Sequence, residues 1–421
     1  MPMSMAMPDD AQHVPLRLDV ERWATRQVRR RVLAVVHTVT AGQRLLEAVR
    51  LLDGDPRVQV LFTAAPDVFR HGVQDFLAEI RALVVPWSEA VRTEFDLAVA
   101  AAHGGLHELH APVIVLPHGA GHNKFVPAPG RGRAVPGRDV YGLSRQRLVR
   151  DGVVVPETIV LSHRDELARL GRECPEALPA AEVVGDPCFD RITRSMSSRA
   201  LYREALGVAP DQQLVMACST WGGASLSGRD WELLERLVTE LPKDEYRVGL
   251  LLHPHVWNAH GEWQVRSWFA ELSRAGLTLL SHRADWCGAL IAGDYVVGDH
   301  GSVSLYGVMT GVPVLLTGDA GLADAGVDPA SPMEELRSIA PRLRADRPLR
   351  RQLTRSAATY RPDDHKRVAA RITSEPGRYV RRMRALLYRK LRMRPPGVRP
   401  ETGPAMLPVT VRCDRHGGPA W

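Results

Sequence analysis

A turn rich in Gly, Asp, His and Ser stands between two apolar runs in residues 294–316, DYVVGDHGSVSLYGVMTGVPVLL. Residues 295–297 predict a buried strand, residues 302–310 a short helix, and residues 312–316 a second strand. Strand, turn, helix and strand form a βαβ unit, and its turn follows the carboxyl end of the first strand. Open α/β sheets bind ligands at that edge, so this turn is the first candidate site.

The turn has the groups that a diphosphate requires. Ser302 is typical of a helix N-cap, and the hydroxyls of Ser302 and Ser304, with the backbone at Gly301, can donate hydrogen bonds to phosphate oxygens. The Asp299 carboxylate would repel phosphate, so we expect it, with His300, to contact the donor's transferred group or to fix the loop. The alternative is an ordinary capped helix start, which does not need His beside Asp.

A second turn rich in hydrogen-bond donors, TWGGAS, follows an apolar run at residues 214–217. The paired glycines Gly222 and Gly223 let backbone amides approach an anion, and Thr220 adds a hydroxyl. The turn matches neither the dinucleotide fingerprint GxGxxG nor the GxxxxGK[ST] loop. Trp221 has two interpretations, stacking on a nucleobase or filling the wall of the site.

Histidines follow strands in both halves of the chain. His253 ends the run 248–252 and can donate to, or protonate, a leaving phosphate, with His255 as a supporting residue. Two histidines at this spacing without a third ligand do not predict a metal site. In the first half, HGAGHNK follows the run 113–116; His118 is the candidate general base for an acceptor hydroxyl, and Lys124 supports it.

Two other histidines could be mistaken for this base. His122 is close to His118 in the sequence, and His37, at the end of the first predicted strand, is a weaker candidate of the same kind. For each candidate, the alternative is a core histidine that is hydrogen-bonded to a carbonyl.

Composition limits the class of protein. The 421 residues suit two domains, and a net charge of +7 favours an acidic partner such as a nucleotide, a phosphopolymer or an anionic membrane. Much of the excess charge is near the C-terminus, which argues against nucleic-acid binding. The five scattered cysteines form no CxxC pair and predict neither a disulfide framework nor a zinc site. No signal peptide and no long apolar run is present, which predicts a cytoplasmic protein.

Alternating strands and helices predict parallel sheets and hence an α/β fold. We expect five regions along the chain: a flexible N-terminal arm (1–29), a Rossmann-like acceptor domain (30–195), a Rossmann-like nucleotide-donor domain (205–345), a basic helical region (346–394) and a disordered tail (395–421). A cleft between two facing sheets would bring their polar turns together.

Residues 376–395 contain eight Arg and Lys residues and no Asp or Glu. Val380, Met383, Leu387 and Leu391 recur at helical spacing, so the predicted helix has one apolar face. This helix is expected to pack across the two domains with its arginines in solvent. The alternative is a helix that binds anionic lipid at the inner face of the plasma membrane.

Together, HG…K, VGDPCFD, STWGGASL, LHP and GDHGSVSLYG…GVPV resemble the CDP-glycerol glycerophosphotransferase family of teichoic-acid polymerase-like enzymes, over residues 110–320. The resemblance implies a GT-B fold, with two facing Rossmann-like domains, parallel sheets and a C-terminal crossing helix. It also implies a catalytic His118, a His-Pro motif at His253, and a D-x-S-S turn at Asp299 and Ser302. The chain departs from that turn at Gly301, which replaces the first serine.

Two further departures concern the donor. His300 stands where an aromatic residue is usual, and leucines precede His253 where the family has an arginine. These departures argue against CDP-glycerol as the donor more than they argue against a nucleotide-diphosphate donor in general.

The predicted function is transfer of a glycerophosphate, polyol-phosphate or glycosyl group to a hydroxyl acceptor. The donor would be CDP-glycerol or a nucleotide sugar, and a lipid-linked acceptor would suit cell-envelope polymer synthesis. No cofactor or metal is expected, because His and backbone N–H groups supply the positive character. One alternative is a nucleotide-sugar 2-epimerase or hydrolase of GT-B architecture, although SVSLYG lacks the paired acids of the epimerases. The other is a non-catalytic binding protein of the same fold.

Overall fold

The computed structural model describes residues 26–125, 140–283, 285–318, 326–398 and 400–413. These residues divide between two compact units, each of which is described by itself. The first unit lies within Met1–His118, Leu148–Val160 and Met383–Arg399, and the second within Gly119–Arg147, Leu161–Arg382 and Pro400–Trp421.

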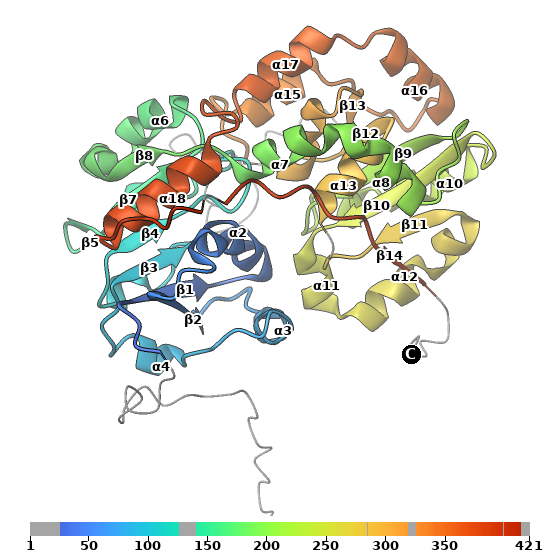
Figure 1. The fold of residues 1–421 in the computed structure, drawn as a ribbon. Helices are drawn as coiled ribbons and strands as arrows, with labels where there is room; N and C mark the ends of the chain where they lie inside the picture. The colour runs from blue at the N-terminus through green and yellow to red at the C-terminus, as the bar shows by residue number, and fades with distance from the viewer. Residues whose placement is uncertain (1–25, 126–139, 284, 319–325, 399, 414–421) are drawn as a thin grey trace, which may run out of the picture. The chain divides into compact units, whose positions relative to one another are not determined.

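The first unit is a parallel sheet with helices (Figure 1). Its strands lie in the order β2-β1-β3-β4-β7. They are β1 (Arg30–Val36), β2 (Val58–Ala64), β3 (Leu97–Ala100), β4 (Val113–Val115) and β7 (Thr158–Leu161), with the short hairpin β5 (Val149–Arg150) and β6 (Val153–Val154). The helices are α2 (Val39–Val49), α3 (Val73–Glu79), α4 (Trp87–Ala90) and, from Met383 onward, α18 (Tyr379–Lys390).

The apolar face of α18 is part of the core of the first unit. Met383, Leu387 and Leu391 are buried, and the Tyr388 hydroxyl donates to the Asp55 carboxylate at 2.8 Å. The hydrogen-bonded guanidinium of Arg57 holds the pKa of Asp55 well below its usual range. This apolar face is therefore used in packing, as the first interpretation of residues 376–395 required.

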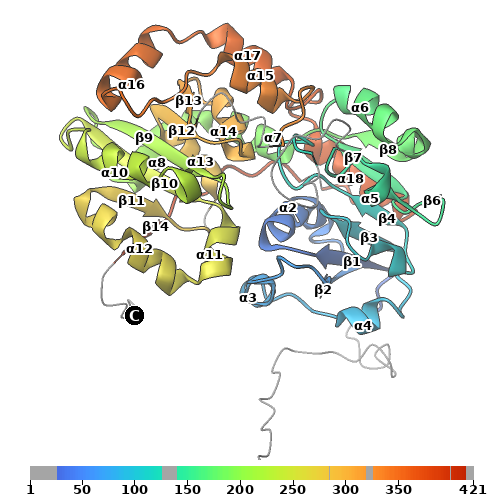
Figure 2. The same cartoon turned by 180° about the vertical axis from the view of Figure 1, so that it is seen from behind.

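The second unit has a six-stranded sheet in the order β13-β12-β9-β10-β11-β14. Its strands are β9 (Gln213–Ser219), β10 (Tyr246–Leu252), β11 (Leu277–Leu280), β12 (Tyr295–Gly298), β13 (Val314–Leu316) and β14 (Thr410–Val411); all pair in parallel except β14. Helices α9 (Leu226–Arg229), α10 (Trp231–Thr239), α11 (Pro254–His260), α12 (Glu262–Ala275), α13 (Trp286–Ala292), α14 (Ser302–Tyr306) and α15 (Pro332–Ile339) lie between or after the strands (Figure 2).

The remaining elements of the second unit precede or follow this sheet in the sequence. They are α5 (Arg145–Leu148), α6 (Asp165–Glu173), β8 (Ala181–Val183), α7 (Pro187–Ser195), α8 (Arg199–Ala205), α16 (Leu349–Ala358) and α17 (Pro362–Ala370).

The central strand β9 is apolar on both faces, as a strand covered by helices on both sides must be. Leu214, Met216 and Cys218 contribute to one core cluster, and Val215 and Ala217 to another. The continuous apolar run in the sequence thus reflects burial on both faces of the sheet. The polar residues that follow it are left at the carboxyl edge.

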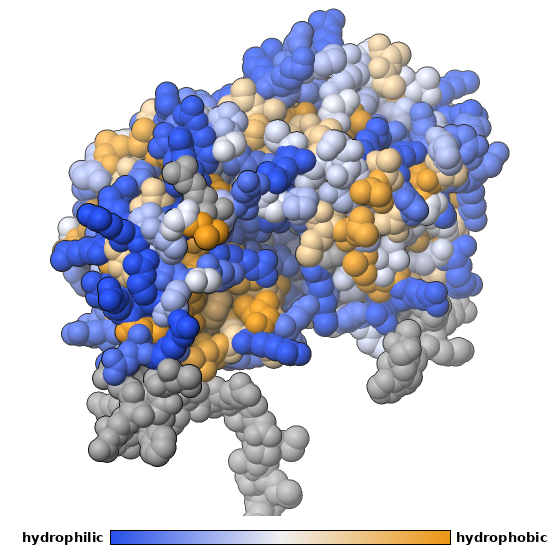
Figure 3. All heavy atoms as spheres, in the orientation of Figure 1, coloured by the Kyte–Doolittle hydropathy of each residue, from blue (hydrophilic) through white to orange (hydrophobic). Residues whose placement is uncertain are grey.

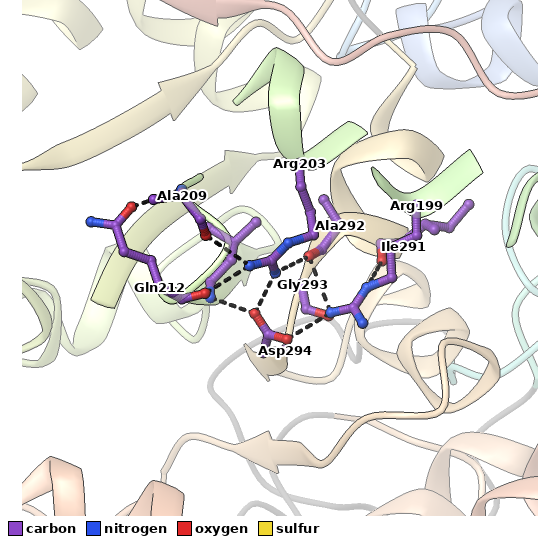
Figure 4. A network of polar contacts seen from close by, with 9 residues as sticks. Arg199, Arg203, Ala209, Gln212, Ile291, Ala292, Gly293 and Asp294 are labelled. Atoms are coloured by element: carbon purple, nitrogen blue, oxygen red, sulfur yellow. Dashed lines mark hydrogen bonds and ion pairs between the residues drawn. The ribbon is translucent and has the colours of Figure 1, made fainter. Parts of the chain in front are cut away.

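A polar network fixes the opposite edge of the sheet (Figure 4). The Asp294 carboxylate, just before β12, accepts from Arg199 at 2.7 Å, from Arg203 at 2.6 Å and from the Leu214 N–H at 2.7 Å. Both arginines lie on α8 and also donate to backbone carbonyls of residues 291–293. The network therefore ties α8 to the starts of β9 and β12, the two strands that precede the candidate turns.

One sequence prediction is wrong. In the tail, residues 400–413 are not disordered, because β14 pairs antiparallel with the edge strand β11 and the Tyr202 hydroxyl donates to the Ala405 carbonyl. An edge strand has unpaired backbone groups, and the tail satisfies them. The predicted arm at 1–29 lies almost entirely outside the described residues.

None of the helices in the described part of the chain has the length and apolar character needed to cross a bilayer. On the face drawn in Figure 3, apolar residues are interspersed among hydrophilic ones.

Candidate functional site

The Asp299 carboxylate joins the two candidate turns of the second unit. Its Oδ2 accepts from the Thr220 N–H and hydroxyl, both at 2.8 Å, and from the Leu226 N–H at 3.0 Å. Its Oδ1 accepts from the Gly301 N–H at 3.0 Å. Asp299 is 5 % exposed, so these four bonds satisfy a buried charge. Asp299 therefore fixes the loops, one of the two roles expected from the sequence.

A shallow cationic pocket, partly open to solvent, lies beside these turns. Arg229, Arg337 and Arg342 line it together with His300 and Thr317; Ala224, Asp299 and Leu316 complete the lining. The residues come from the carboxyl ends of β12 and β13, the turn after β9, helices α9 and α15, and the segment after α15. Guanidinium groups recognise phosphate and carboxylate oxygens through paired hydrogen bonds, so the pocket suits an anion.

His300 lies in the field of these cations. Burial, together with the charges of Lys124, Arg337 and Arg229, lowers its pKa to about 4 against the opposing charge of Asp299. His300 is therefore neutral at pH 7. Burial also lowers the pKa of Lys124, against the charge of Asp299. An anion in the pocket would stabilise the protonated form of both groups.

Ser302 is the first residue of α14, and Gly301 occupies the N-cap position predicted for Ser302. The Ser302 hydroxyl is therefore not used in capping and accepts from the Ala120 N–H at 3.3 Å. A Cβ on Gly119 would lie 2.5 Å from the Ser302 Oγ, so a larger residue there would require the Ser302 side chain to shift. Because α14 has only five residues, its N-terminal dipole is weak. The arginines of the pocket supply more positive charge than this helix start.

Two predicted phosphate ligands have other contacts. Ser304 is 1 % exposed and lies against Gly298, where a Cβ would meet its Oγ at 2.1 Å. The Thr220 hydroxyl already donates its hydrogen to Asp299. The Ser304 hydroxyl is buried and has no hydrogen-bond partner among the described residues, and the assignment of both residues as phosphate ligands stays a prediction. Gly222 and Gly223 remain in an exposed turn, and Gly222 has a positive φ of 83°.

His253 caps the seven-residue helix α11, which follows β10. Its Nδ1 accepts from the His255 N–H at 3.1 Å, so the neutral ring carries its proton on Nε2. His253 can therefore donate from Nε2. The Trp221 ring is 4.6 Å from the His255 ring and 6.4 Å from that of His253, and Trp221 is 41 % exposed. The exposure of Trp221 favours the stacking interpretation over a wall-filling one.

In the first unit, His118 follows β4 and is exposed. A general base must be accessible to the hydroxyl of the acceptor, and His118 meets this requirement. It directly precedes Gly119 in the sequence. His37, in contrast, is fully buried, and its Nε2 is 2.7 Å from the Gly104 carbonyl oxygen. His37 is the core histidine that the alternative interpretation described.

Sequence reasoning missed Arg229, Arg337 and Arg342. Only Arg229 had a local signal, because it follows the TWGGAS turn by four residues. Arg337 and Arg342 come from α15 and the segment after it, where Arg342 pairs with Leu316 at the end of β13. Among the residues that the structure describes, no group of three His, Cys, Asp or Glu side chains is arranged to hold a metal ion.

No protein-family model matches the chain, and no curated protein matches it. Among solved structures, a variant of the wall teichoic acid polymerase TagF has a TM-score of 0.58 at 14% identity, covering 87% of this chain and 90% of that one. TagF itself has a TM-score of 0.56 at 15% identity with the same coverage. HepE from Anabaena, in complex with UDP-glucose, has a TM-score of 0.48 at 15% identity, covering 86% and 98%.

The similarity to TagF confirms the fold class predicted from the sequence, an α/β fold of GT-B type with parallel sheets. It also confirms, at the level of the fold, the resemblance to teichoic-acid polymerase-like proteins.

Proposed function

We propose that the protein is a transferase that binds a nucleotide-diphosphate donor on its second unit. The transferred group would be a glycerophosphate, a polyol phosphate or a glycosyl group, and the acceptor a hydroxyl. The observation that carries this proposal is the pocket that Arg229, Arg337 and Arg342 line beside the turns joined by Asp299. Arg337 also pairs with Glu334 at 2.6 Å, and Arg342 donates to the Gly318 carbonyl. Three guanidinium groups at the ligand-binding edge of a parallel sheet suit the negative charge of a diphosphate.

His118 would take the proton of the acceptor hydroxyl. In glycerophosphate transfer, the acceptor oxygen forms a bond to the distal phosphorus, the bond between the two phosphates breaks, and a nucleoside monophosphate leaves. In glycosyl transfer, the acceptor oxygen bonds to the anomeric carbon of the sugar, the bond from that carbon to the phosphate oxygen breaks, and a nucleoside diphosphate leaves. In either reaction, the His253 Nε2–H would stabilise charge on the leaving phosphate, with His255 in support.

The relatives of known structure support the donor class. A TagF variant has been solved after soaking with CDPG, and TagF is a wall teichoic acid polymerase. For this chain, CDP-glycerol is the first donor to test, followed by UDP- and GDP-linked sugars. Cell-envelope polymer synthesis is the corresponding process.

The decisive assay combines a donor with a hydroxyl acceptor and follows both. A transferase consumes the donor only when the acceptor is present and joins the two in the product. Consumption of the donor without acceptor would instead support a hydrolase or epimerase. The variant His118→Ala separates catalysis from binding, since it should bind the donor normally and lose turnover. Donor binding with no turnover in the wild-type protein would support a non-catalytic binding protein.

A lipid-linked acceptor at the inner face of the plasma membrane would be approached through residues 376–395. Because the apolar face of α18 is buried, this contact would be electrostatic and made by exposed arginines such as Arg381 and Arg392. Pelleting with vesicles that contain anionic lipid should therefore occur at low salt and be lost at high salt. Absence of pelleting at low salt would reject the membrane contact.

A further inference from the structure

A buried ionic cluster lies behind the loop 119–124 of the second unit, and the proposed reaction does not use it. The Glu166 Oε1 accepts from the His122 N–H at 2.9 Å and is 2.8 Å from the His122 Nδ1. Its Oε2 accepts from the N–H groups of Ser162 and His163. Glu166 is 4 % exposed. Burial raises the pKa of this carboxyl, but the charge and hydrogen bonds of His122, with the charge of Arg169, outweigh it and lower the pKa to about 2. Glu166 is therefore a buried anion that holds the loop.

Arg169 and Asp328 also contact this loop. Arg169 donates to the His122 carbonyl and forms an ion pair with Asp328 at 2.5 Å. The Asp328 N–H donates to the Asn123 carbonyl at 2.8 Å, and both charged side chains are buried. We call Glu166, Arg169 and Asp328 the loop brace. Three buried charges that all contact one short loop are costly, so their arrangement points to a loop whose position matters.

The loop that the brace holds ends at Lys124. The backbone of Lys124 bridges to Val327, and its carbonyl accepts from the Tyr141 N–H at 2.7 Å. At its other end, the loop lies against Ser302 through Gly119 and Ala120. Among the described residues, the Lys124 ammonium has no hydrogen-bond or ion-pair partner, although its charge acts on both His300 and Asp299. A partly buried ammonium group without a protein partner is available to bind an anion.

The residue type is informative as well. Only four of the 55 Lys and Arg residues in the chain are lysines: Lys124, Lys243, Lys366 and Lys390. A lysine ammonium is a compact charge whose pKa responds to burial, whereas an arginine guanidinium stays charged and needs more space. The loop therefore places a small, titratable cation within electrostatic range of His300 and Asp299, two residues that line the arginine pocket.

We propose that the loop brace is a positioning device that holds Lys124 beside Asp299 and His300, where its ammonium group binds a phosphate of the donor. This inference rests on the proposed function for its ligand. Glu166, Arg169 and Asp328 do not contact the donor and act only through the loop 119–124. Binding of a phosphate restores to Lys124 the charge that burial disfavours, so binding raises the pKa of Lys124.

The experiment uses the full chain with its lysines reductively ¹³C-methylated, which gives four lysine side-chain signals that NMR can follow through a pH titration. The variant Lys124→Arg assigns the signal of Lys124. In the ligand-free wild-type protein, this signal should titrate at lower pH than that of Lys366, whose side chain is 76 % exposed. Saturating pyrophosphate should move the titration of Lys124 to higher pH and leave that of Lys366 unchanged.

The variants Glu166→Gln and Asp328→Asn test the brace. Each should return the titration of Lys124 in the ligand-free protein toward that of Lys366, and each should weaken pyrophosphate binding about tenfold in calorimetry. The matched control is Asp294→Asn, which breaks an ion-pair network of the same unit that does not contact the loop. This control should lower the melting temperature and leave both readouts unchanged.

The outcomes separate the inference from the proposed function. If pyrophosphate binds but the Lys124 signal does not respond, or if both brace variants fold and behave like the control, the inference is wrong and the pocket remains. If pyrophosphate does not bind the wild-type protein, the proposed donor site and the phosphate role of Lys124 both fail, and the ligand-free titrations still decide whether the brace sets the environment of Lys124. Should Glu166→Gln not fold, Asp328→Asn and the wild-type response to pyrophosphate decide.

Discussion

The Asp299 carboxylate accepts both the backbone N–H and the hydroxyl of Thr220, each at 2.8 Å. Thr220 follows β9 and Asp299 follows β12, and these strands are neighbours in the sheet of the second unit. One buried side chain therefore holds together the two turns that border the cationic pocket. The position of the pocket depends on this pair more than on any hydroxyl within the turns.

Replacing Asp299 with Asn should lower the free energy of unfolding by about 2–3 kcal/mol, because an amide can present only one acceptor oxygen to four donors. Denaturant titration measures this loss, and the exposed Asp211→Asn of the same unit is the control. Pyrophosphate affinity should fall as well, since the turns are no longer joined. Unchanged stability would show that Asp299 does not hold the turns.

The pocket arginines are expected to carry the phosphate affinity. A charge-assisted hydrogen bond is worth about 1.5–3 kcal/mol, so Arg337→Ala or Arg229→Ala should weaken pyrophosphate binding about tenfold or more. Arg236→Ala is the matched control, because Arg236 lies on α10 and pairs with Glu240 away from the pocket. Calorimetry at constant ionic strength measures the affinities. Equal losses in the control and pocket variants would indicate a non-specific charge effect.

His300 should make the protein less stable as the pH falls. Its pKa in the folded chain is lowered to about 4 from 6.5, so between these values the unfolded chain binds a proton that the folded chain does not. Stability should therefore be unaffected at pH 7 and decrease from about pH 6.5 to about pH 4, by at most about 3 kcal/mol. His300→Asn should flatten this part of the pH–stability curve. A curve of the same slope in the variant would contradict the assigned environment.

Tyr388 tests the packing of α18 in the first unit. Removing the hydroxyl that donates to Asp55 should cost about 1 kcal/mol, because Arg57 still satisfies the carboxylate. Denaturant unfolding of Tyr388→Phe measures the cost. No loss of stability would indicate that the hydrogen bond from Tyr388 to Asp55 does not help to hold α18 in the first unit.

The periodicity of the sequence predicted the βαβ segments well, because strands buried on both faces must be continuously apolar and their turns must be polar. Thus β9, β12 and β13 lie where the runs 214–217, 295–297 and 312–316 placed them. Single-residue geometry was harder to predict. The cap is Gly301 instead of Ser302, and Ser304 faces inward, because one residue of rotation on a short helix changes which hydroxyl is exposed.

Contacts between residues far apart in the sequence could not be read from local patterns. Arg337 and Arg342 reach the pocket because α15 follows β13, and no motif in the sequence indicates this position. The role of Asp299 was left open between two possibilities until its donors were known. The tail was predicted as disordered from its Pro and Gly content, whereas the unpaired edge of β11 gives residues 410–411 a partner.

The central claim is that the second unit binds a nucleotide-diphosphate donor, and the melting temperature tests it most directly. We expect one of CDP-glycerol, UDP-linked sugars or GDP-linked sugars to raise the melting temperature of the wild-type protein in a concentration-dependent way, by mass action on the folded state. The same compound should give a much smaller rise with Arg337→Ala. If none of these donors changes the melting temperature at millimolar concentration, the claim is contradicted.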